Sequence, residues 1–406
     1  MGKSRAPEHA AFLDWLLKQM SARKVDALIV AGDIFDTGAP PSYAREMYNR
    51  FIVDIQSTGC ELLVLGGNHD SVATLNESKA LLACLNTHVV SGVTQNIDSQ
   101  IITLKNRQGE AGAIVCAVPF IRARDVMISQ AGQSASDKKQ VLQQSISEHY
   151  HALYKQAVRV QKAHHKTHKK QLPIIATGHL TTVGASTSDS VREIYIGTLD
   201  AFPASAFPPV DYIALGHIHR SQLVAKSAHI RYSGSPIPLS FDETKGQGEK
   251  SVLVVDFKDG AFKKAQALTI PGFQPMQMIK GDLDSIEKQL KDLPNKFELE
   301  PSQSIWVEVQ VTSQDYLNDL QTRVQTLTEN LPVEVLLLRR ERNKRQSALY
   351  KEEKETLNEL SVEDVFERRL AEEDWQGDDQ EKRLKRLKSN FKQVVDSLAD
   401  AHGESA

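Results

Sequence analysis

The sequence predicts a layered α/β fold, on the basis of one amphipathic helix and a series of short apolar runs. The segment His9–Arg23 repeats apolar residues every three or four positions, which is typical of a helix with one apolar face. The runs that follow are rich in valine, isoleucine and leucine, and several end in glycine and polar residues. Continuous apolar runs of this kind are typical of strands buried on both faces, with helices packed outside the sheet.

Four of the predicted strands lead directly into polar residues that can carry chemistry. They are Ala27–Ala31 before Gly32–Asp33, Leu62–Leu65 before Gly66–Asp70, Ile174–Thr177 before Gly178–His179, and Tyr212–Leu215 before Gly216–His219. Other strands are predicted at His88–Ser91, Ile101–Leu104, Ala113–Val118, Ile230–Ser233 and Ser251–Phe257. Ligands of open α/β sheets bind at the carboxyl ends of the strands, so we expect the polar strand ends to converge.

A polar segment, Ser134–Lys170, separates the predicted strands. Its second half, Lys155–Lys170, contains six Lys/Arg and three His without an acidic residue. Two interpretations are open: the solvated face of a helix, or a surface that contacts the phosphate groups of a nucleic acid.

The sequence pattern changes near Pro271, so the first predicted domain covers residues 1–270. Residues 271–340 follow a β-α-β-α-β pattern and predict a small separate α/β domain. Its predicted elements are Met276–Ile279, Asp284–Leu293, Ile305–Val311, Gln314–Leu327 and Val333–Leu338. Residues 341–406 are highly charged, and two helices are predicted from their apolar faces. These faces comprise Val365, Phe366 and Leu370, then Leu384, Leu387, Phe391, Val394, Val395 and Leu398. Such helices could fold back on the preceding domain or dock on a partner protein.

The composition restricts the classes of function. The net charge of the 406 residues is −3, so a nucleic-acid surface would have to be a local basic patch. No run approaches the roughly 18 apolar residues of a membrane span, and the first residues lack the apolar segment of a signal peptide. Three cysteines without paired spacing favour reduced thiols, so we expect a cytoplasmic protein.

The polar strand ends together offer one carboxylate, one amide oxygen and several imidazoles. This mixed donor set suits Mn, Fe, Zn or Co better than Ca. Asp33 has two carboxylate oxygens and can bridge two cations, while Asn68 adds a neutral oxygen. His179, His217 and His219 add neutral nitrogens, and strand alternation would place the last two on one side, where each could serve a different metal. Two metals about 3.5–4 Å apart polarise a phosphoryl oxygen and lower the pKa of a bound water.

His69 is better placed as an acid or a transition-state donor than as a metal ligand. It follows Asn68 directly, and Asp70 could hold its imidazole in one tautomer. A lone Gly-Asp or Gly-His at a strand end is usually only a turn. The combination of Gly66–Asp70 with Gly216–His219 is far more specific, and it favours a metal site.

The four polar strand ends resemble the signature of the calcineurin-like metallophosphoesterases. Further stretches are similar to the SbcD family, the nuclease subunits of bacterial SbcCD complexes. These stretches are Ala31–Gly38, Gly178–Thr182, Tyr195–Ala204, Arg231–Pro236 and Leu331–Leu337. The resemblance covers essentially the whole chain.

The resemblance implies a sandwich of two sheets flanked by helices, then a capping domain, then C-terminal helices that bind the ATPase subunit SbcC. It implies a homodimer within a heterotetramer, acting at the nucleoid in DNA end processing, recombination, replication and repair. The implied activity is ATP-modulated exonuclease cleavage of double-stranded DNA and endonuclease cleavage of single strands and hairpins, with two Mn²⁺ ions. By position, Asp33 would bridge the metals, Asn68, His179 and His217 would complete one site, and His219 would belong to the other. His69 would stabilise the transition state, with Asp70 behind it.

The chain departs from this family in one respect. Family members begin with a strand leading into Asp-x-His, which gives the His219 metal two ligands, and no such motif precedes Asp33. The second metal site would then be incomplete, with only Asp33 and His219. We expect a start codon assigned too far downstream; a true truncation would weaken the enzyme and expose an unpaired sheet edge.

Two other functions stay open. The chain could be another enzyme of the superfamily that acts on small phosphodiesters or phosphoproteins, although such an enzyme needs neither a capping domain nor trailing helices. It could also be a catalytically weakened DNA-binding or scaffold subunit, because the Asp-x-His motif is absent.

Overall fold

The computed structural model describes residues 3–126, 134–188, 191, 201–244, 249–301, 303–312, 320–340, 370, 386–388 and 390–391. Residues 1–341 form one compact unit, and residues 342–406 are assigned to a second. Most of the two apolar faces predicted in 341–406 lies outside the described residues. Residues 195–200 of the SbcD-like stretch Tyr195–Ala204 also lie outside them.

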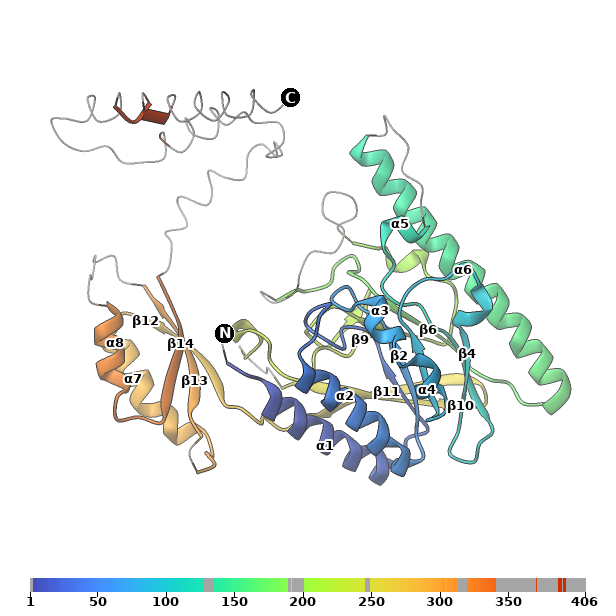
Figure 1. Ribbon diagram of the computed structural model, residues 1–406, viewed down its shortest axis with the longest axis horizontal. Helices are drawn as coiled ribbons and strands as arrows, with labels where there is room; N and C mark the ends of the chain where they lie inside the picture. The colour runs from blue at the N-terminus through green and yellow to red at the C-terminus, as the bar shows by residue number, and fades with distance from the viewer. Residues whose placement is uncertain are drawn as a thin grey trace. The chain divides into compact units, whose positions relative to one another are not determined.

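Two sheets carry most of the strands in the first unit (Figure 1). The smaller sheet is parallel and consists of β1 (Ala27–Val30), β2 (Glu61–Leu65) and β3 (Thr87–Val90), in that order. The larger sheet has the order β4-β5-β6-β7-β9-β8. Its strands are β4 (Ile101–Lys105), β5 (Ala111–Cys116), β6 (Ile174–His179), β7 (Tyr212–Gly216), β8 (Gln222–Val224) and β9 (Ser227–Tyr232). A hairpin is formed by β10 (Ser251–Lys258) and β11 (Ala261–Thr269).

Helices and short 3-10 turns connect these strands. The helices are α1 (Ala6–Arg23), α2 (Ser42–Ile55), α3 (Val72–Asn76), α4 (Lys79–Ala83), α5 (Ala123–Val126) and α6 (Ala135–His168). The 3-10 turns are η1 (Gln56–Thr58), η2 (Ile97–Gln100), η3 (Ala204–Ala206) and η4 (Phe241–Thr244). Within the described parts of the chain, every helix is too short or too polar to cross a membrane.

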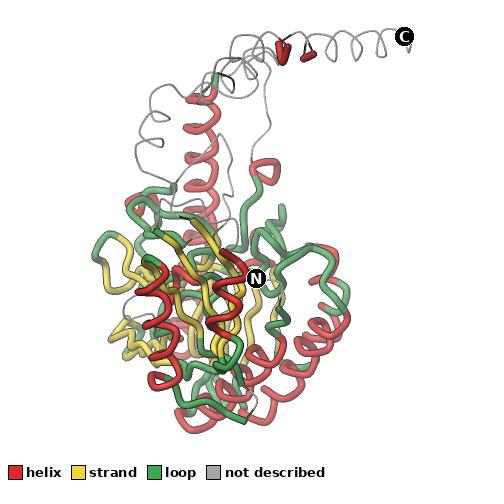
Figure 2. Tube along the Cα trace, turned by 90° about the vertical axis from the view of Figure 1, so that its left-hand side faces the viewer, coloured by secondary structure: helices red, strands yellow, loops and turns green. Residues whose placement is uncertain are grey.

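The central strands bury both faces because their side chains alternate between two cores. In β2, Leu62 and Val64 pack with α1 and α2, whereas Leu63 and Leu65 pack against the larger sheet. The other face of the larger sheet packs on α6. Figure 2 shows the strands, in yellow, gathered between the helices, in red. The predicted sandwich of two sheets flanked by helices is confirmed.

The polar segment predicted at 134–170 is the single helix α6. Ser134 begins it with a capping box, in which its hydroxyl accepts from the Asp137 amide and the Asp137 carboxylate accepts from the Ser134 amide. Leu142, Ile146 and Tyr150 bury one face of the helix against the larger sheet. The basic side chains of 155–170 are largely exposed, which suits both a solvated face and a phosphate-contacting surface.

A third sheet follows the sandwich along the chain. It is parallel and consists of β12 (Met276–Gly281), β13 (Ile305–Val311) and β14 (Val333–Arg340), in that order. It is accompanied by α7 (Leu283–Asp292), η5 (Leu293–Lys296) and α8 (Leu320–Thr328), and it has a hydrophobic core of its own. The elements match the predicted β-α-β-α-β pattern, although the predicted start of α8 at 314 falls outside the described residues.

Candidate metal centre

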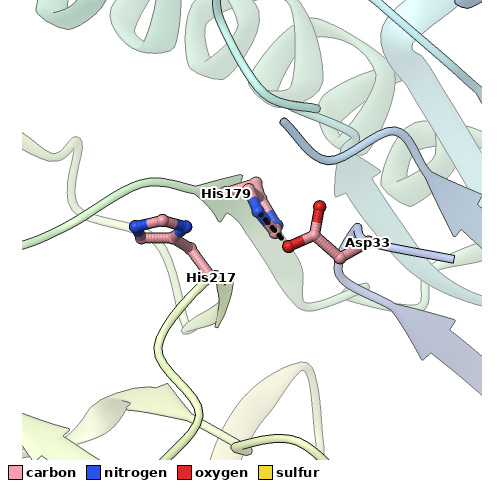
Figure 3. A group of neighbouring side chains, drawn as sticks. All are labelled: Asp33, His179 and His217. Carbon is pink, nitrogen blue, oxygen red and sulfur yellow. Dashed lines mark ion pairs between the residues drawn. The ribbon is translucent and has the colours of Figure 1, made fainter. Parts of the chain in front are cut away.

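Three of the predicted residues meet at the carboxyl ends of β1, β6 and β7. One ligand atom from each of Asp33, His179 and His217 lies within 4.8 Å of the other two. Figure 3 shows the Asp33 carboxylate paired with the His179 ring, and the His217 ring on the other side of His179. The atoms Asp33 Oδ2 and His179 Nε2 are 3.1 Å apart. Residues that are far apart in the sequence thus form one group of oxygen and nitrogen donors.

The imidazole of His179 is oriented by contacts at both of its nitrogens. Nδ1 lies 2.8 Å from the carbonyl oxygen of Ala31, so the proton on Nδ1 is donated there. Nε2 then faces two oxygens, Asp33 Oδ2 at 3.1 Å and Asn68 Oδ1 at 2.9 Å. Oxygen lone pairs around an imidazole nitrogen require either a proton or a metal ion between them. Backbone anchoring of the outer nitrogen is also how metal-binding histidines are held in proteins.

The protonation states favour metal ligands at Asp33 and His217. Burial opposes ionisation of Asp33, but the His179 ring and the His69 amide outweigh burial and lower the pKa of Asp33 to about 2. Burial and repulsion from His179 lower the pKa of His217 to about 3, so this ring is neutral at physiological pH. Burial also disfavours the charged form of His179, but its hydrogen bond to Asp33 raises the pKa above the ordinary value. A metal ion would therefore compete with protonation most strongly at His179.

The strand ends approach so closely that only glycine fits beside the ligands. A Cβ at Gly216 would lie 1.8 Å from the Ala31 carbonyl oxygen, and one at Gly32 would lie 2.3 Å from His179 Nδ1. Asp33 (φ 54°) and His217 (φ 87°) themselves adopt positive φ angles, which are uncommon for residues other than glycine. Strained backbone of this type gathers at functional sites, where the surrounding fold stabilises it.

The prediction that Asp70 holds the imidazole of His69 is wrong. The buried carboxylate of Asp70 accepts hydrogen bonds from the backbone amides of Ile34, Phe35 and Gly67 instead. It fixes the loop after β2 to the loop after β1, and these amides occupy the oxygens that would have met the His69 ring. That ring contacts Asp36, with Nδ1 at 2.9 Å from its carbonyl oxygen and 3.4 Å from Oδ1. The sequence signal for Asp36, which we missed, is an acid three residues after Asp33 in the same loop.

The argument from strand alternation at His217 and His219 is also wrong, because β7 ends at Gly216 and both histidines follow it. His217 turns toward the group of donors, with Nδ1 3.2 Å from Asn68 Oδ1, and its buried Nε2 has no hydrogen-bond partner among the residues that the structure describes. His219 instead places Nδ1 3.1 Å from Oε1 of Glu243, a residue that sequence analysis did not predict. The two rings nevertheless line one cavity of about 1560 Å³ together with Asp33 and His179.

Comparison with known protein families agrees with this architecture. The family model for calcineurin-like phosphoesterases matches residues 6–221. A model described as the type 5 capsule protein repressor C-terminal domain matches residues 272–374. The sandwich fold and its donor group at the strand ends, together with the first match, define a calcineurin-like phosphoesterase.

Individual relatives narrow this class. The SbcD subunit of the SbcCD nuclease from Escherichia coli (strain K12) is 52% identical over 400 residues, covering 98% of this chain and 95% of that protein. The SbcD subunits of Rhodobacter capsulatus and Bacillus subtilis are 32% and 26% identical over 69% and 78% of this chain, and 67% and 76% of their own lengths. The chain belongs to the SbcD family of nuclease subunits. Among solved structures, a family 1 β-glucosidase from Thermotoga maritima has a TM-score of 0.21 at 13% identity, covering 80% of this chain and 76% of that one; this score is too low to bear on the fold.

Proposed function

We propose that this chain is a DNA nuclease subunit that hydrolyses phosphodiester bonds with divalent metal ions, with DNA ends and hairpins as its substrates. The observation that carries the proposal is the position of His179 Nε2, which faces the oxygens of Asp33 and Asn68, at a cavity lined by Asp33 and His179. Oxygens that converge on one imidazole nitrogen in this way can hold a cation in place of the proton there. The bond to be cleaved would be a phosphodiester of DNA. The exposed basic face of α6 would contact the phosphate groups of the DNA backbone.

The donor set fits a transition metal such as Mn²⁺. One site would be held by Asp33, Asn68, His179 and His217, a mixture of oxygen and nitrogen ligands. The buried Nε2 of His217 supports this assignment. It lacks a hydrogen-bond partner within the described part of the chain, and a buried polar atom without a partner is costly. A second ion would be shared through Asp33 and held by His219. When bound, such ions supply Lewis-acid activation of the phosphoryl group and of a water molecule.

His69 would act on the reacting phosphate without binding metal. Its Nδ1 is occupied by Asp36, so Nε2 is the nitrogen that remains to donate a proton or a hydrogen bond. Its backbone amide also donates to Asp33 Oδ1, at 3.1 Å, which couples the position of His69 to that of the bridging carboxylate. The Asp70 carboxylate accepts from the amides of Ile34 and Gly67, and in this way it fixes the loops that carry Asp33 and His69.

The variant His69→Ala is expected to keep Mn²⁺ binding and lose cleavage by about 10²–10⁴-fold, the usual contribution of a positioned acid–base group. Cleavage of linear duplex DNA and calorimetric Mn²⁺ titration would be measured on the same preparation. His88→Ala, on β3, serves as the control with unchanged activity. Loss of metal binding in His69→Ala would show that the residue is a ligand.

The substrate class is tested by offering different phosphoesters to the same enzyme. With Mn²⁺ we expect hydrolysis of linear duplex DNA and of hairpin ends, with little activity on cyclic nucleotides or phosphopeptides. Activity confined to the small substrates would refute the nuclease proposal in favour of another phosphoesterase function. The second candidate function is that of a catalytically weakened scaffold subunit. It predicts one bound Mn²⁺ or none, and no cleavage of any substrate.

We also propose the division of labour along the chain and its assembly. Residues 1–270 would form the nuclease domain, 271–340 a capping domain, and 341–406 helices that bind an SbcC-type ATPase subunit, with the complex acting at the nucleoid. The chain would assemble as a homodimer within a heterotetramer. Light scattering of the purified chain would return the mass of a monomer if the dimer proposal is wrong.

A further inference from the structure

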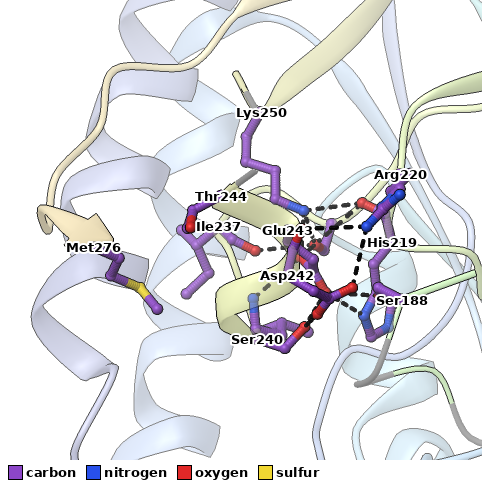
Figure 4. Close-up of polar contacts among 12 residues, drawn as sticks. Ser188, His219, Arg220, Ile237, Ser240, Asp242, Glu243, Thr244, Lys250 and Met276 are labelled. Atoms are coloured by element: carbon purple, nitrogen blue, oxygen red, sulfur yellow. Dashed lines mark hydrogen bonds and ion pairs between the residues drawn. The ribbon is translucent and has the colours of Figure 1, made fainter. Parts of the chain in front are cut away.

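A buried polar cluster lies around His219, beyond the group of donors at Asp33, His179 and His217. Its centre is Glu243 on η4, whose side chain is fully buried. Figure 4 shows His219 and Lys250 meeting this carboxylate from different elements, with Asp242 and Arg220 beside them. Sequence analysis assigned no role to Glu243 or to Lys250.

Glu243 accepts hydrogen bonds on both of its oxygens. Oε1 accepts from the hydroxyls of Ser188 (2.9 Å) and Ser240 (3.2 Å), and it lies 3.1 Å from Nδ1 of His219. Oε2 accepts from Lys250 Nζ at 2.5 Å and from the Leu239 amide at 3.2 Å. A carboxylate surrounded by donors and by an ammonium group is stabilised in its charged, acceptor-only form. The nitrogen of His219 that faces it must therefore carry the proton.

The ion pair of Glu243 and Lys250 also holds the backbone of His219. Lys250 Nζ donates to the His219 carbonyl oxygen at 2.9 Å, and the Ser235 amide donates to that oxygen at 3.1 Å. Lys250 Nζ further donates to the Ser235 hydroxyl at 2.7 Å. The Glu243–Lys250 pair thus fixes both the ring and the main chain of one residue. Buried ion pairs often contribute little net stability. The arrangement of this pair therefore indicates that it serves to orient His219.

We infer that Glu243 is a positioning residue, which holds His219 as the Nδ1-protonated tautomer so that its Nε2 lone pair is presented to a divalent metal ion. The inference rests on the proposed function, because it takes His219 as a metal ligand. Carboxylates that accept from the outer nitrogen of a metal-binding histidine orient the ring and strengthen it as a ligand. Here the carboxylate is itself anchored by Lys250, which gives the ring a rigid support. Lys250 is the second positioning residue, since it restrains Glu243 and the His219 carbonyl together.

The first test is made on the wild-type protein, and a variant is needed only to assign the signal. In metal-free wild-type protein labelled with ¹⁵N-histidine, we expect the His219 ring to show a protonated Nδ1 and an unprotonated Nε2, with the signal assigned by its loss in His219→Gln. Observation of the opposite tautomer, or of a mixture of both, would overturn the inference. This measurement is independent of metal binding and of cleavage.

The second test removes the carboxylate without leaving a lone buried charge. The double variant Glu243→Met with Lys250→Met is expected to abolish the tautomer preference, while Lys250→Met alone keeps it because Glu243 remains. Asp242→Asn is the matched control, since this neighbouring acid pairs with Arg220 at 3.1 Å. An unchanged His219 tautomer in the double variant would overturn the role of Glu243.

Mn²⁺ titration then separates this inference from the proposed function. His219→Ala and the double variant are expected to weaken the same binding step by about 10–100-fold, the usual effect of losing such a support, while Asp242→Asn stays near wild type. A Mn²⁺ affinity that falls in His219→Ala but is unchanged in the double variant would overturn the inference alone. An affinity unchanged in both would overturn the inference and also the assignment of His219 as a ligand of the second ion. Failure of the wild-type chain to bind Mn²⁺ at all would overturn the proposed function, and the tautomer result would still report on the Glu243 contact.

Discussion

Replacement of Asp33 by asparagine is expected to remove nearly all metal-dependent cleavage. Asp33 has a pKa of about 2 and is therefore a carboxylate at any working pH, with one oxygen toward His179 and the other toward the His69 amide. Asparagine preserves the shape but offers one neutral oxygen in place of two charged ones, so it cannot bridge and neutralise two cations. Bound metals contribute several kcal/mol to stabilising the transition state, so we expect a loss of roughly a thousandfold or more.

The measurement is the initial rate on linear duplex DNA at saturating Mn²⁺, together with the calorimetric affinity for Mn²⁺, which should also fall. The matched control is Asp26→Asn, an acid just before the other end of β1. Its carboxylate accepts a hydrogen bond from the backbone amide of Arg107 at 3.0 Å. A cleavage rate and a Mn²⁺ affinity close to wild type in Asp33→Asn would contradict the bridging role.

Replacement of Lys250 by methionine is expected to destabilise the fold by about 3–5 kcal/mol, the usual cost of removing one partner from a buried ion pair. The side chains of Glu243 and Lys250 are 0% and 11% exposed, so water cannot replace the lost ammonium group. Burial lowers the pKa of Lys250, which shows that the protein environment already opposes its charge. The carboxylate left behind would lose the partner that compensates its own burial.

Thermal and urea unfolding of the metal-free protein would measure this effect. The control is Lys264→Met, because Lys264 pairs with Asp256 at 3.4 Å with both side chains about half exposed; exposed pairs of this kind contribute about 1 kcal/mol or less. Adding Glu243→Met to Lys250→Met should restore part of the stability, because removing both charges costs less than removing one. An unfolding midpoint for Lys250→Met equal to that of Lys264→Met would show that the pair is well solvated.

Much of the fold follows from local pattern. The apolar runs at β1, β2, β6 and β7 predict strands because alternate residues bury on both faces, and the repeat in His9–Arg23 predicts α1. The hairpin strand β11 escaped prediction because its lysines and alanines leave it at most half-buried along its length. Helix α2 was missed as well, since its buried residues gather at its end, at Phe51, Ile52 and Ile55.

The sequence by itself determined which residues make up the candidate metal centre, because the combination of Gly66–Asp70 with Gly216–His219 after buried strands is far more specific than a single Gly-Asp or Gly-His. It placed Asp33, Asn68, His179 and His217 in one group, as the structure does. Only the tertiary structure decided which neighbours hold these groups: Asp36 instead of Asp70 at His69, and Glu243 with Lys250 at His219. The physical reason is that a short sequence motif fixes which side chains are available as metal ligands. The orientation of a ring depends on contacts between loops distant in the chain, and these exist only after the two sheets have packed.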